Sequence, residues 1–453
     1  MKQTILEKAS EFITSASFGA LPESVRSETK KALIDYIGCA VAGSREPVSN
    51  AAVAWAQGRN CVGEATVLGR SERFAAPETA FCNGTIGHAL DYDDCSTTSL
   101  GHPTTIAGPA VLALGEIQGR SGKDLITAYA VGVEVGHKLA VAANPETSER
   151  GWHTTSVFGV PMAAAATCYL MGANVSVTCN GLGISLSRSS GLRNNFGTMT
   201  KPLHAGLAVL DGMESAGLAA CGITSSPLAC EGKDGFIDCF SGVSRNLENI
   251  VFGKNWDLED PGIWFKPYPC CSGAHAAVDA ISEAINAGGI RYEDVASIHV
   301  GCSLLAPREL VESFPEKAVE ARFSMQYALA ARLIYGELGI AQYTDEKVND
   351  PGVRKLMNSI TMEIHPELAK RGFIADSPVI MTITRKDGST LTLAKDIPRG
   401  LRPNRFTDKD IADKFLQTAT RYLPETKARQ ALDQFLALES VQNIKKLMRL
   451  LVP

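Results

Sequence analysis

Five short polar segments hold most of the residues in this sequence that could take part in catalysis. The central one, Arg193–Gly206, reads RNNFGTMTKPLHAG and places Lys201 and His204 between two long apolar stretches. Its glycines and proline are typical of turn-like backbone, and connecting segments held by rigid helices are where catalytic groups tend to lie. We predict that Lys201 serves a site and that His204 caps or packs against the next helix. An ordinary surface loop would also explain the segment alone.

A second segment, Gly87–Thr104 (GHALDYDDCSTTSLGHPT), adds two histidines and a cluster of carboxylates. Asp91, Asp93 and Asp94 would repel one another if they pointed the same way, so they must diverge or face cations. A metal cluster is an alternative, but EF-hand spacing and the HxxxH and HExxH patterns are absent. We predict no metal: one aspartate orients a histidine or binds a substrate hydroxyl, and the others cap the next helix.

A histidine and several hydroxyls precede a helix in Arg150–Gly159 (RGWHTTSVFG). Exposed N–H groups at the helix start, hydroxyl donors and the imidazole of His153 together suit a carboxylate. Capping of the helix by Thr154 or Thr155 is a structural alternative, and both can hold at once. The segment therefore predicts a carboxylate-binding corner around His153.

A lysine among aromatic residues and prolines marks Phe265–His275 (FKPYPCCSGAH). Desolvation there would lower the pKa of Lys266 and suit it to acid/base work or to holding an anion. A solvated lysine at a domain joint is an equal alternative. Cys271 and His275 could also form a nucleophilic pair, but nothing in the sequence indicates an activating environment.

The fifth segment, Arg322–Tyr327 (RFSMQY), opens an alanine-rich helix and alone is typical of a polar helix start. Together the five segments offer lysines, histidines, an arginine, a tyrosine and an aspartate, without a phosphate loop or a dinucleotide fingerprint. Such a set suits a small polycarboxylate that loses a proton next to a carboxylate while cations stabilise the enolate-like charge. We therefore predict lyase or isomerase chemistry without a cofactor.

Composition argues against several other classes of protein. The net charge is −5 and 21% of residues are charged, so we expect neither a nucleic-acid partner nor a membrane role. The N-terminal residues have the pattern of an amphipathic helix rather than that of a signal peptide. No stretch of the chain approaches the roughly 18 consecutive apolar residues that a membrane span needs. Twelve cysteines without a CxxC pair suggest neither zinc nor disulfides. We predict a cytoplasmic enzyme in which His137, His299 and His365 are structural.

The secondary structure that must position these segments changes near residue 260, from helices alone to a mixture of strands and helices. At 453 residues the chain is too long for one ordinary core. The first part shows helical periodicity and small residues, and only Glu64–Leu68 resembles a strand there. Beyond residue 260 come alternating strands with a hairpin signal at Lys386–Gly388, and then amphipathic helices. Helices are expected at 22–42, 75–90, 104–118, 122–143, 156–171, 175–190, 205–221, 273–287, 318–337, 408–422 and 424–450, and strands at 295–303, 359–365, 378–384 and 389–393.

We therefore predict a mainly α protein with a smaller α+β domain. Residues 1–262 and 402–453 are assigned to an all-helical domain, and residues 263–401 to the α+β domain. Short Gly-Pro elements near Pro261 and Leu401 are the expected hinges between them.

The polar segments resemble the MmgE/PrpD family, whose activities include 2-methylcitrate dehydratase, cis-aconitate decarboxylase and iminodisuccinate epimerase. The resemblance spans residues from about 30 to 330 and, more weakly, the remainder. It implies a large all-helical domain, an α+β lid domain, a homodimer and a metal-free site between the domains. The motifs that carry it are HALDYDD with GHP, GWHTTSVFG, GTMTKPLHAG, KPYPCCSGAH and RFSMQYA.

The resemblance also implies a set of active-site residues. We predict catalytic roles for His102, Lys201, Asp93 and Tyr327, with His102 and Lys201 as acid/base groups and Tyr327 as a second donor or acid. Predicted substrate-binding residues are His153, Lys266, Arg322, Thr97 and Cys271, of which Thr97 rests on the loop after Asp94. Animal-type decarboxylases of the family have a histidine at the position of Cys271, whereas the fungal type has a cysteine pair similar to this one.

Three functions remain open from the sequence. The first is a cofactor-independent lyase that dehydrates or decarboxylates a di- or tricarboxylate similar to cis-aconitate or 2-methylcitrate. The second is an epimerase of a dicarboxylate similar to iminodisuccinate, which needs a second base such as Tyr327 or Lys266. The third is a polycarboxylate-binding relative without catalytic activity. The sequence lacks the FPAEFH motif of dedicated 2-methylcitrate dehydratases and so lies outside that branch.

Overall fold

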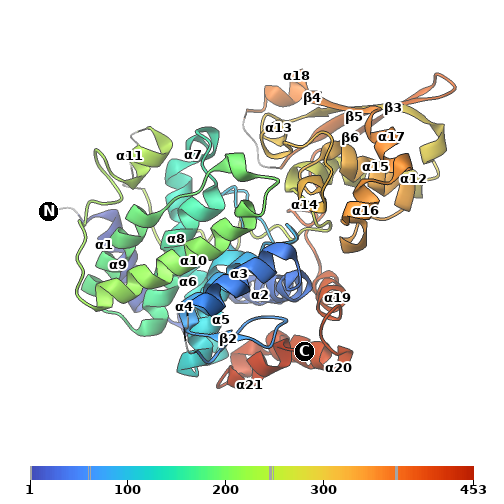
Figure 1. The fold of residues 1–453 in the computed structure, drawn as a ribbon. Helices are drawn as coiled ribbons and strands as arrows, with labels where there is room; N and C mark the ends of the chain where they lie inside the picture. The colour runs from blue at the N-terminus through green and yellow to red at the C-terminus, as the bar shows by residue number, and fades with distance from the viewer. Residues whose placement is uncertain (1–2, 60, 62, 244–246, 248, 373–375) are drawn as a thin grey trace.

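Two large hydrophobic cores organise the part of the chain that the computed structural model describes, residues 3–59, 61, 63–243, 247, 249–372 and 376–453. One core joins helices from the first half of the chain to residues 406–451, and the other lies within residues 270–383. Figure 1 shows them as a helical body, blue to green with red C-terminal helices, and a smaller yellow-to-orange body that contains the sheet. The predicted fold class, mainly α with a smaller α+β part, is confirmed.

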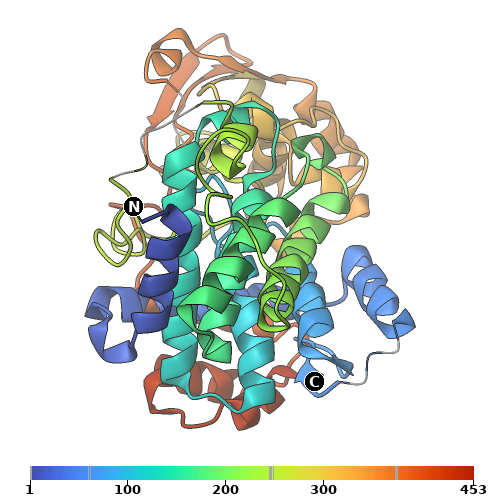
Figure 2. The ribbon, with the colours of Figure 1, turned by 90° about the vertical axis from the view of Figure 1, so that its left-hand side faces the viewer.

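The helical domain keeps most of the predicted helices, and two of them have the predicted bounds. The expected strand at 64–68 shrinks to β1 (Ala65–Thr66), which pairs with β2 (Arg73–Phe74). The helices of this domain are α1 (Ile5–Ser15), α2 (Glu23–Gly43), α3 (Pro47–Gly58), α4 (Ala76–Gly87), α5 (Thr104–Gln118), α6 (Gly122–Ala143), α7 (Glu146–Glu149), α8 (Thr154–Met171), α9 (Val175–Arg188), α10 (Thr200–Ala220), α11 (Phe236–Ser241), α19 (Asp408–Ala419), α20 (Glu425–Leu436) and α21 (Lys445–Met448). In Figures 1 and 2 the red helices α20 and α21 lie at the end of this domain far from the sheet.

Small residues let α10 pack closely on α4 and α8. A Cβ added at Gly212 would lie 2.5 Å from the carbonyl oxygen of Val160, and one added at Gly84 would lie 3.1 Å from the Cα of Gly206. Side chains at these positions would push the helices apart. The close packing fixes the end of α4 relative to the start of α10, where His88 and Lys201 lie.

The α+β domain is built on a mixed four-stranded sheet of order β4-β3-β5-β6. Strands β3 (Val295–Cys302) and β4 (Ile360–Ile364) are parallel, whereas β5 (Val379–Arg385) and β6 (Thr390–Lys395) form the predicted hairpin. The predicted helix at 318–337 is interrupted, because Ser324 accepts a hydrogen bond from Tyr327 N and starts a new helix. The helices of this domain are α12 (His275–Asn286), α13 (Ala306–Glu309), α14 (Ala318–Ala321), α15 (Met325–Tyr335), α16 (Asp345–Val348), α17 (Pro351–Met357) and α18 (Pro366–Ala369).

Helices α6 and α8 are long and apolar enough to cross a membrane by length and composition alone, with mean hydropathies of 1.3 and 1.2. In each, 89% of the 18-residue window is buried inside the protein. Burial of this kind is typical of the core helices of a soluble protein, so the two helices are weak evidence for a membrane span.

The junction between the two domains lies against the aspartate-rich segment. Cys95 and Trp264 exchange two backbone hydrogen bonds of 2.9 Å, and the Trp264 indole donates to the carbonyl oxygen of Arg399. The chain segment that leaves the helical domain at Trp264 and the segment that returns to it after Arg399 therefore lie side by side. Lys266, two residues beyond Trp264, is held against the helical domain. The boundaries at 262 and 402 remain a prediction.

Candidate active site

A small cavity between the two domains gathers residues from all five polar segments. The helical domain contributes the aspartate-rich loop, the start of α8 and the start of α10, and the α+β domain contributes the opposite wall. Both domains are therefore needed to build the site. The lining residues are Asp91, Leu100, His102, His153, Thr155, Phe196, Lys201, Lys266, Cys271, Ser272, Glu309 and Phe323.

Asp91 joins the two lysines at the centre of the site. Its Oδ1 accepts a hydrogen bond of 2.5 Å from Lys201 Nζ, and its Oδ2 accepts one of 2.8 Å from Lys266 Nζ. Burial favours a raised pKa for Asp91, but the two lysines outweigh burial and hold its pKa well below the ordinary value. Asp91 is therefore ionised at neutral pH. The sequence did not single it out over its neighbours Asp93 and Asp94.

The expected lowering of the pKa of Lys266 is wrong. Burial does favour a lower pKa, but the Asp91 carboxylate, with smaller contributions from Cys95 and Asp93, raises the pKa of Lys266 above its ordinary value. The Lys266 ammonium also donates to the backbone carbonyl of Asp91 at 2.9 Å. Of the two roles considered for Lys266, the geometry favours holding an anion over acid/base work.

A buried chain of hydrogen bonds lies behind Lys201. His88 Nδ1 is 2.9 Å from both carboxylate oxygens of Asp93, and His88 Nε2 is 2.8 Å from Lys201 Nζ. Since the carboxylate can only accept, we assign the proton of His88 to Nδ1, which leaves Nε2 to accept from the ammonium. Burial lowers the pKa of His88 and keeps it neutral. Asp93 thus orients His88, and His88 in turn holds Lys201. The sequence alone did not indicate this role of His88.

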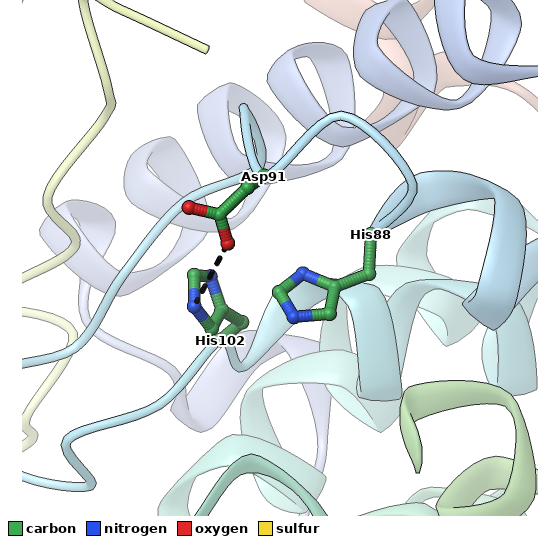
Figure 3. Close-up of side chains that lie close together, drawn as sticks. All are labelled: His88, Asp91 and His102. Atoms are coloured by element: carbon green, nitrogen blue, oxygen red, sulfur yellow. Dashed lines mark ion pairs between the residues drawn. The ribbon is translucent and has the colours of Figure 1, made fainter. Parts of the chain in front are cut away.

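His102 presents a neutral imidazole to the cavity. Its Nδ1 lies 2.8 Å from the carbonyl oxygen of Asp94, which can only accept, so Nδ1 carries the proton. Its Nε2 is then an unprotonated acceptor, 3.9 Å from Asp91 Oδ1, as the dashed line in Figure 3 shows. Burial, together with His88 and Lys201, lowers the pKa of His102 well below the ordinary value. His102 can therefore take up a proton at neutral pH.

His153 has one ring nitrogen without a partner. Its Nδ1 lies 3.0 Å from Nδ1 of His204, whereas its buried Nε2 has no hydrogen-bond partner among the described residues. An unpaired buried polar atom in a cavity wall indicates a ligand, because leaving it unpaired is costly. Burial lowers the pKa of His153 well below the ordinary value and that of His204 to about 4. The sequence predicts that His204 caps or packs against the next helix. His204 lies inside α10 and so does not cap a helix, and its ring bonds to His153, which precedes α8.

One local prediction, and one structural alternative considered beside it, do not hold. Lys201 lies in the first turn of α10 and not in a loop, because Pro202 fits a first turn, where its missing N–H is not needed. Thr154 and Thr155 do not cap α8. Their hydroxyls instead hold the loop that carries His102: Thr155 Oγ1 accepts from His102 N at 3.2 Å, and Thr154 donates to the carbonyl of Leu100.

Four of the predicted residues do not line the inner cavity: Asp93 lies behind Lys201, Thr97 lies further out, and Tyr327 and Arg322 contact other parts of the protein. The Tyr327 hydroxyl donates to the carbonyl oxygen of Gln342 inside the α+β domain. Arg322 crosses to the helical domain, where it donates to the carbonyl of Ala89 at 3.2 Å and pairs with Glu46 at 3.3 Å. The Tyr327 hydroxyl thus holds structure around the site. Arg322 does so through its terminal nitrogens, whereas its buried Nε has no hydrogen-bond partner among the described residues.

The remaining predicted residues lie at the edge of the site. Thr97 lines an outer hollow next to His102. Cys271 lines the inner cavity, and burial raises the pKa of its thiol well above the ordinary value. The nucleophilic pair of Cys271 with His275 is not formed: the Cys271 thiol donates to Glu309 Oε2 at 3.6 Å, and His275 Nε2 is bonded to the carbonyl of Cys270 at 3.1 Å.

Three of these side chains could also hold a metal ion. Ligand atoms of His88, Asp91 and His102, drawn in Figure 3, lie within 4.8 Å of one another. The Lys201 ammonium, however, is bonded to two of the three groups. A metal ion would have to displace this ammonium and would be repelled by it. The donor set therefore suits a metal only if Lys201 is absent.

We predict that removing Lys201 turns this lysine site into a metal site. Zn²⁺ should leave the thermal midpoint of the wild-type protein unchanged, and it should raise that of Lys201→Ala by several degrees, because His88 and Asp91 are freed to bind the ion together with His102. Differential scanning fluorimetry with and without Zn²⁺ measures this. Lys201→Arg, which keeps a cation, is the control. Zn²⁺ stabilisation of the wild type would contradict the prediction.

Comparison with known proteins finds similar sequences that cover most or all of this chain. The model of the MmgE/PrpD N-terminal domain matches residues 7–247, and that of the MmgE/PrpD C-terminal domain matches residues 268–439. The chain is 26% identical to the cis-aconitate decarboxylase of Homo sapiens, covering 100% of this chain and 95% of that protein. It is 26% identical to the cis-aconitate decarboxylase of Aspergillus terreus (95% and 92%) and 24% identical to the mitochondrial 2-methylcitrate dehydratase of Yarrowia lipolytica (91% and 84%).

Proposed function

We propose, from the premise that this chain belongs to the MmgE/PrpD family, that it is a cofactor-independent lyase acting on a small di- or tricarboxylate. The relatives named above are two decarboxylases and one dehydratase, all of them lyases. The observation that carries the proposal is the neutral imidazole of His102 facing two ammonium groups in a buried cavity. Such a site can remove a proton next to a carboxylate and stabilise the charge that develops.

The hydrogen bonds of the two lysines leave donors for a substrate. An ammonium has three N–H groups. Lys201 gives one to His88 and one to Asp91, and Lys266 gives two to Asp91. Each lysine therefore retains one N–H group. We assign these two groups to a substrate carboxylate and to the enolate-like oxygen that forms when the proton leaves.

His102 and His153 complete the proposed mechanism. His102 Nε2 takes the proton next to the bound carboxylate, and Nδ1–H stays on the carbonyl of Asp94. His153 Nε2 contacts a second polar group of the substrate, since it is buried and has no protein partner in the described structure. In dehydration, the electron pair left by the proton forms a double bond while hydroxide leaves the adjacent carbon and takes up a proton to become water. In decarboxylation no proton is removed first: carbon dioxide leaves its electron pair on the substrate as an enolate-like charge, and a protonated group of the site then delivers a proton to that carbon.

The epimerase alternative is less well supported. It needs a second base on the opposite face of the substrate. The Tyr327 hydroxyl is bonded to a carbonyl away from the cavity wall, and Asp91 keeps Lys266 protonated. Neither candidate can act as that base in this arrangement. The homodimer and the cytoplasmic location stay as further proposals, based on the sequence.

A polycarboxylate panel tests the proposed function. The wild-type protein is expected to be stabilised by at least one of cis-aconitate, citrate, 2-methylcitrate and malate, and NMR of the same mixture should show a dehydrated or decarboxylated product. Binding raises the thermal midpoint because the ligand binds only the folded state. Stabilisation without a product would favour the non-catalytic alternative, and exchange of a C–H proton with solvent without a product would favour the epimerase.

A further inference from the structure

The cavity wall contains a carboxylate that the proposed mechanism does not use. Glu309, the last residue of α13, lines both the inner cavity and the outer hollow beside Thr97. Among the described lining residues it is the one acid that the α+β domain contributes. Its recorded hydrogen bond is weak: the Cys271 thiol donates to Oε2 at 3.6 Å. Its carboxylate is thus largely available to a ligand.

The charges of the wall give Glu309 an unusual position in a site for polycarboxylates. Lys201 and Lys266 supply two positive charges, and Asp91 bonds to both and cancels one of them. An ionised Glu309 cancels the other. A carboxylate that faces an anionic substrate costs binding energy unless the substrate offers it a hydrogen-bond donor. Burial raises the pKa of Glu309 above its ordinary value, although the hydrogen bond from Cys271 and the charges of Lys201 and Lys266 act to lower it.

The groups in the cavity also differ from one side to the other. The cations and His153 lie on the inner side, whereas Glu309 lies with Ser272 on the side that continues into the outer hollow. A substrate with its carboxylates on the lysines and His153 would direct its remaining substituent toward Glu309. A hydroxyl or an ammonium there would pair with the carboxylate, and a third carboxylate would be repelled.

We propose that Glu309 is a specificity-determining residue that selects dicarboxylates bearing a hydroxyl or amino group and rejects tricarboxylates. This inference rests on the proposed function, because it places the substrate carboxylates on Lys201 and Lys266. It narrows that function to one substrate class. It also assigns the α+β domain a role in recognition beyond closing the cavity.

Isothermal titration with Glu309→Gln tests the proposal without requiring turnover. Malate and aspartate represent the selected class, and cis-aconitate represents the tricarboxylates. The wild type is expected to bind malate or aspartate at least about tenfold more tightly than cis-aconitate, and Glu309→Gln should lower this preference by about tenfold, the effect of one charged hydrogen bond. Gln keeps the shape and removes the charge. Glu309→Ala should give the same loss of preference.

Glu312→Gln is the matched control, because Glu312 is close in sequence but is absent from the residues lining the cavity. It should keep the preference of the wild type. An unchanged preference in Glu309→Gln and Glu309→Ala, or a wild type that prefers cis-aconitate, would overturn the role of Glu309 and leave the proposed function standing. Binding of none of these acids to the wild type would overturn the proposed function as well.

Discussion

Replacing His102 by alanine is expected to lower kcat by about 10²- to 10⁴-fold, the range for loss of a general base. The residue is a neutral imidazole whose tautomer is fixed by the carbonyl of Asp94. Its removal leaves both lysines on Asp91, so substrate binding should change little. A fall in kcat with a nearly constant KM, measured on the substrate that the panel identifies, is the expected signature.

Two controls separate a missing base from a damaged fold. Added imidazole should restore part of the activity of His102→Ala, because a small base can enter the space left by the ring. His299→Ala should keep full activity, since His299 lies on the exposed face of the sheet, with 45% of its side chain accessible. Unreduced turnover in His102→Ala would rule out this residue as the base.

The pH dependence provides a further test of the His102 assignment. Because burial, His88 and Lys201 hold the pKa of His102 well below 6.5, the residue stays unprotonated as the pH falls through 6.5. The activity should therefore not decline near that pH on account of this group, and it should be lost only in more acidic solution. A decline centred near pH 6.5 that disappears in His102→Ala would contradict the assignment.

The second large effect is expected on stability. Asp91→Asn should lower the free energy of unfolding by about 3–5 kcal/mol, the cost of leaving buried charges without a partner. Two ammonium groups lose their shared carboxylate at once. Asp91 has a positive φ of 50°, a conformation that asparagine tolerates well, so this substitution removes the charge and not the turn. Urea unfolding at neutral pH measures the loss.

The sign of the pH effect follows from the lowered pKa of Asp91. A carboxylate whose folded-state pKa is depressed stabilises the fold above its unfolded-state pKa of about 3.9 and loses this contribution as the pH falls through the folded value. The gap between wild type and Asp91→Asn should thus be full at pH 6–8 and shrink below about pH 4. Asp94→Asn should cost much less, because burial raises the pKa of Asp94 and favours its neutral form. Equal losses for both variants would refute the explanation.

The sequence predicted the helices and strands well, because their periodicity is local. Helices α5 and α6 have the predicted bounds, and the hairpin at Lys386–Gly388 lies where its turn residues indicated. The interruption before α15 was missed, since a capping serine inside an alanine-rich run gives little signal. The start of α10 was missed because Pro202 was taken as a sign of a loop.

The sequence predicted which segments form the site, but it did not predict which side chains bond to one another there. Which of three neighbouring aspartates holds the lysines depends on the left-handed turn at Asp91, where the sequence has no glycine to mark it. The raised pKa of Lys266 depends on that same aspartate, 175 residues away in the chain. His88 could have been suspected from its place five residues before Asp93, although spacing alone does not show that it accepts from Lys201.

The discontinuous helical domain has a consequence for synthesis on the ribosome. Lys414 of α19 pairs with Asp35 of α2 at 2.7 Å, and it donates to the carbonyl of Tyr92, 322 residues earlier in the chain. All three residues are buried. The face of α2 that packs on α19 therefore stays uncovered until α19 has left the exit tunnel. The α+β domain, whose core is contiguous in sequence, can fold before them. A chain that stops before α19 would lack the partner for α2 and is expected to be recognised as unfinished by chaperones.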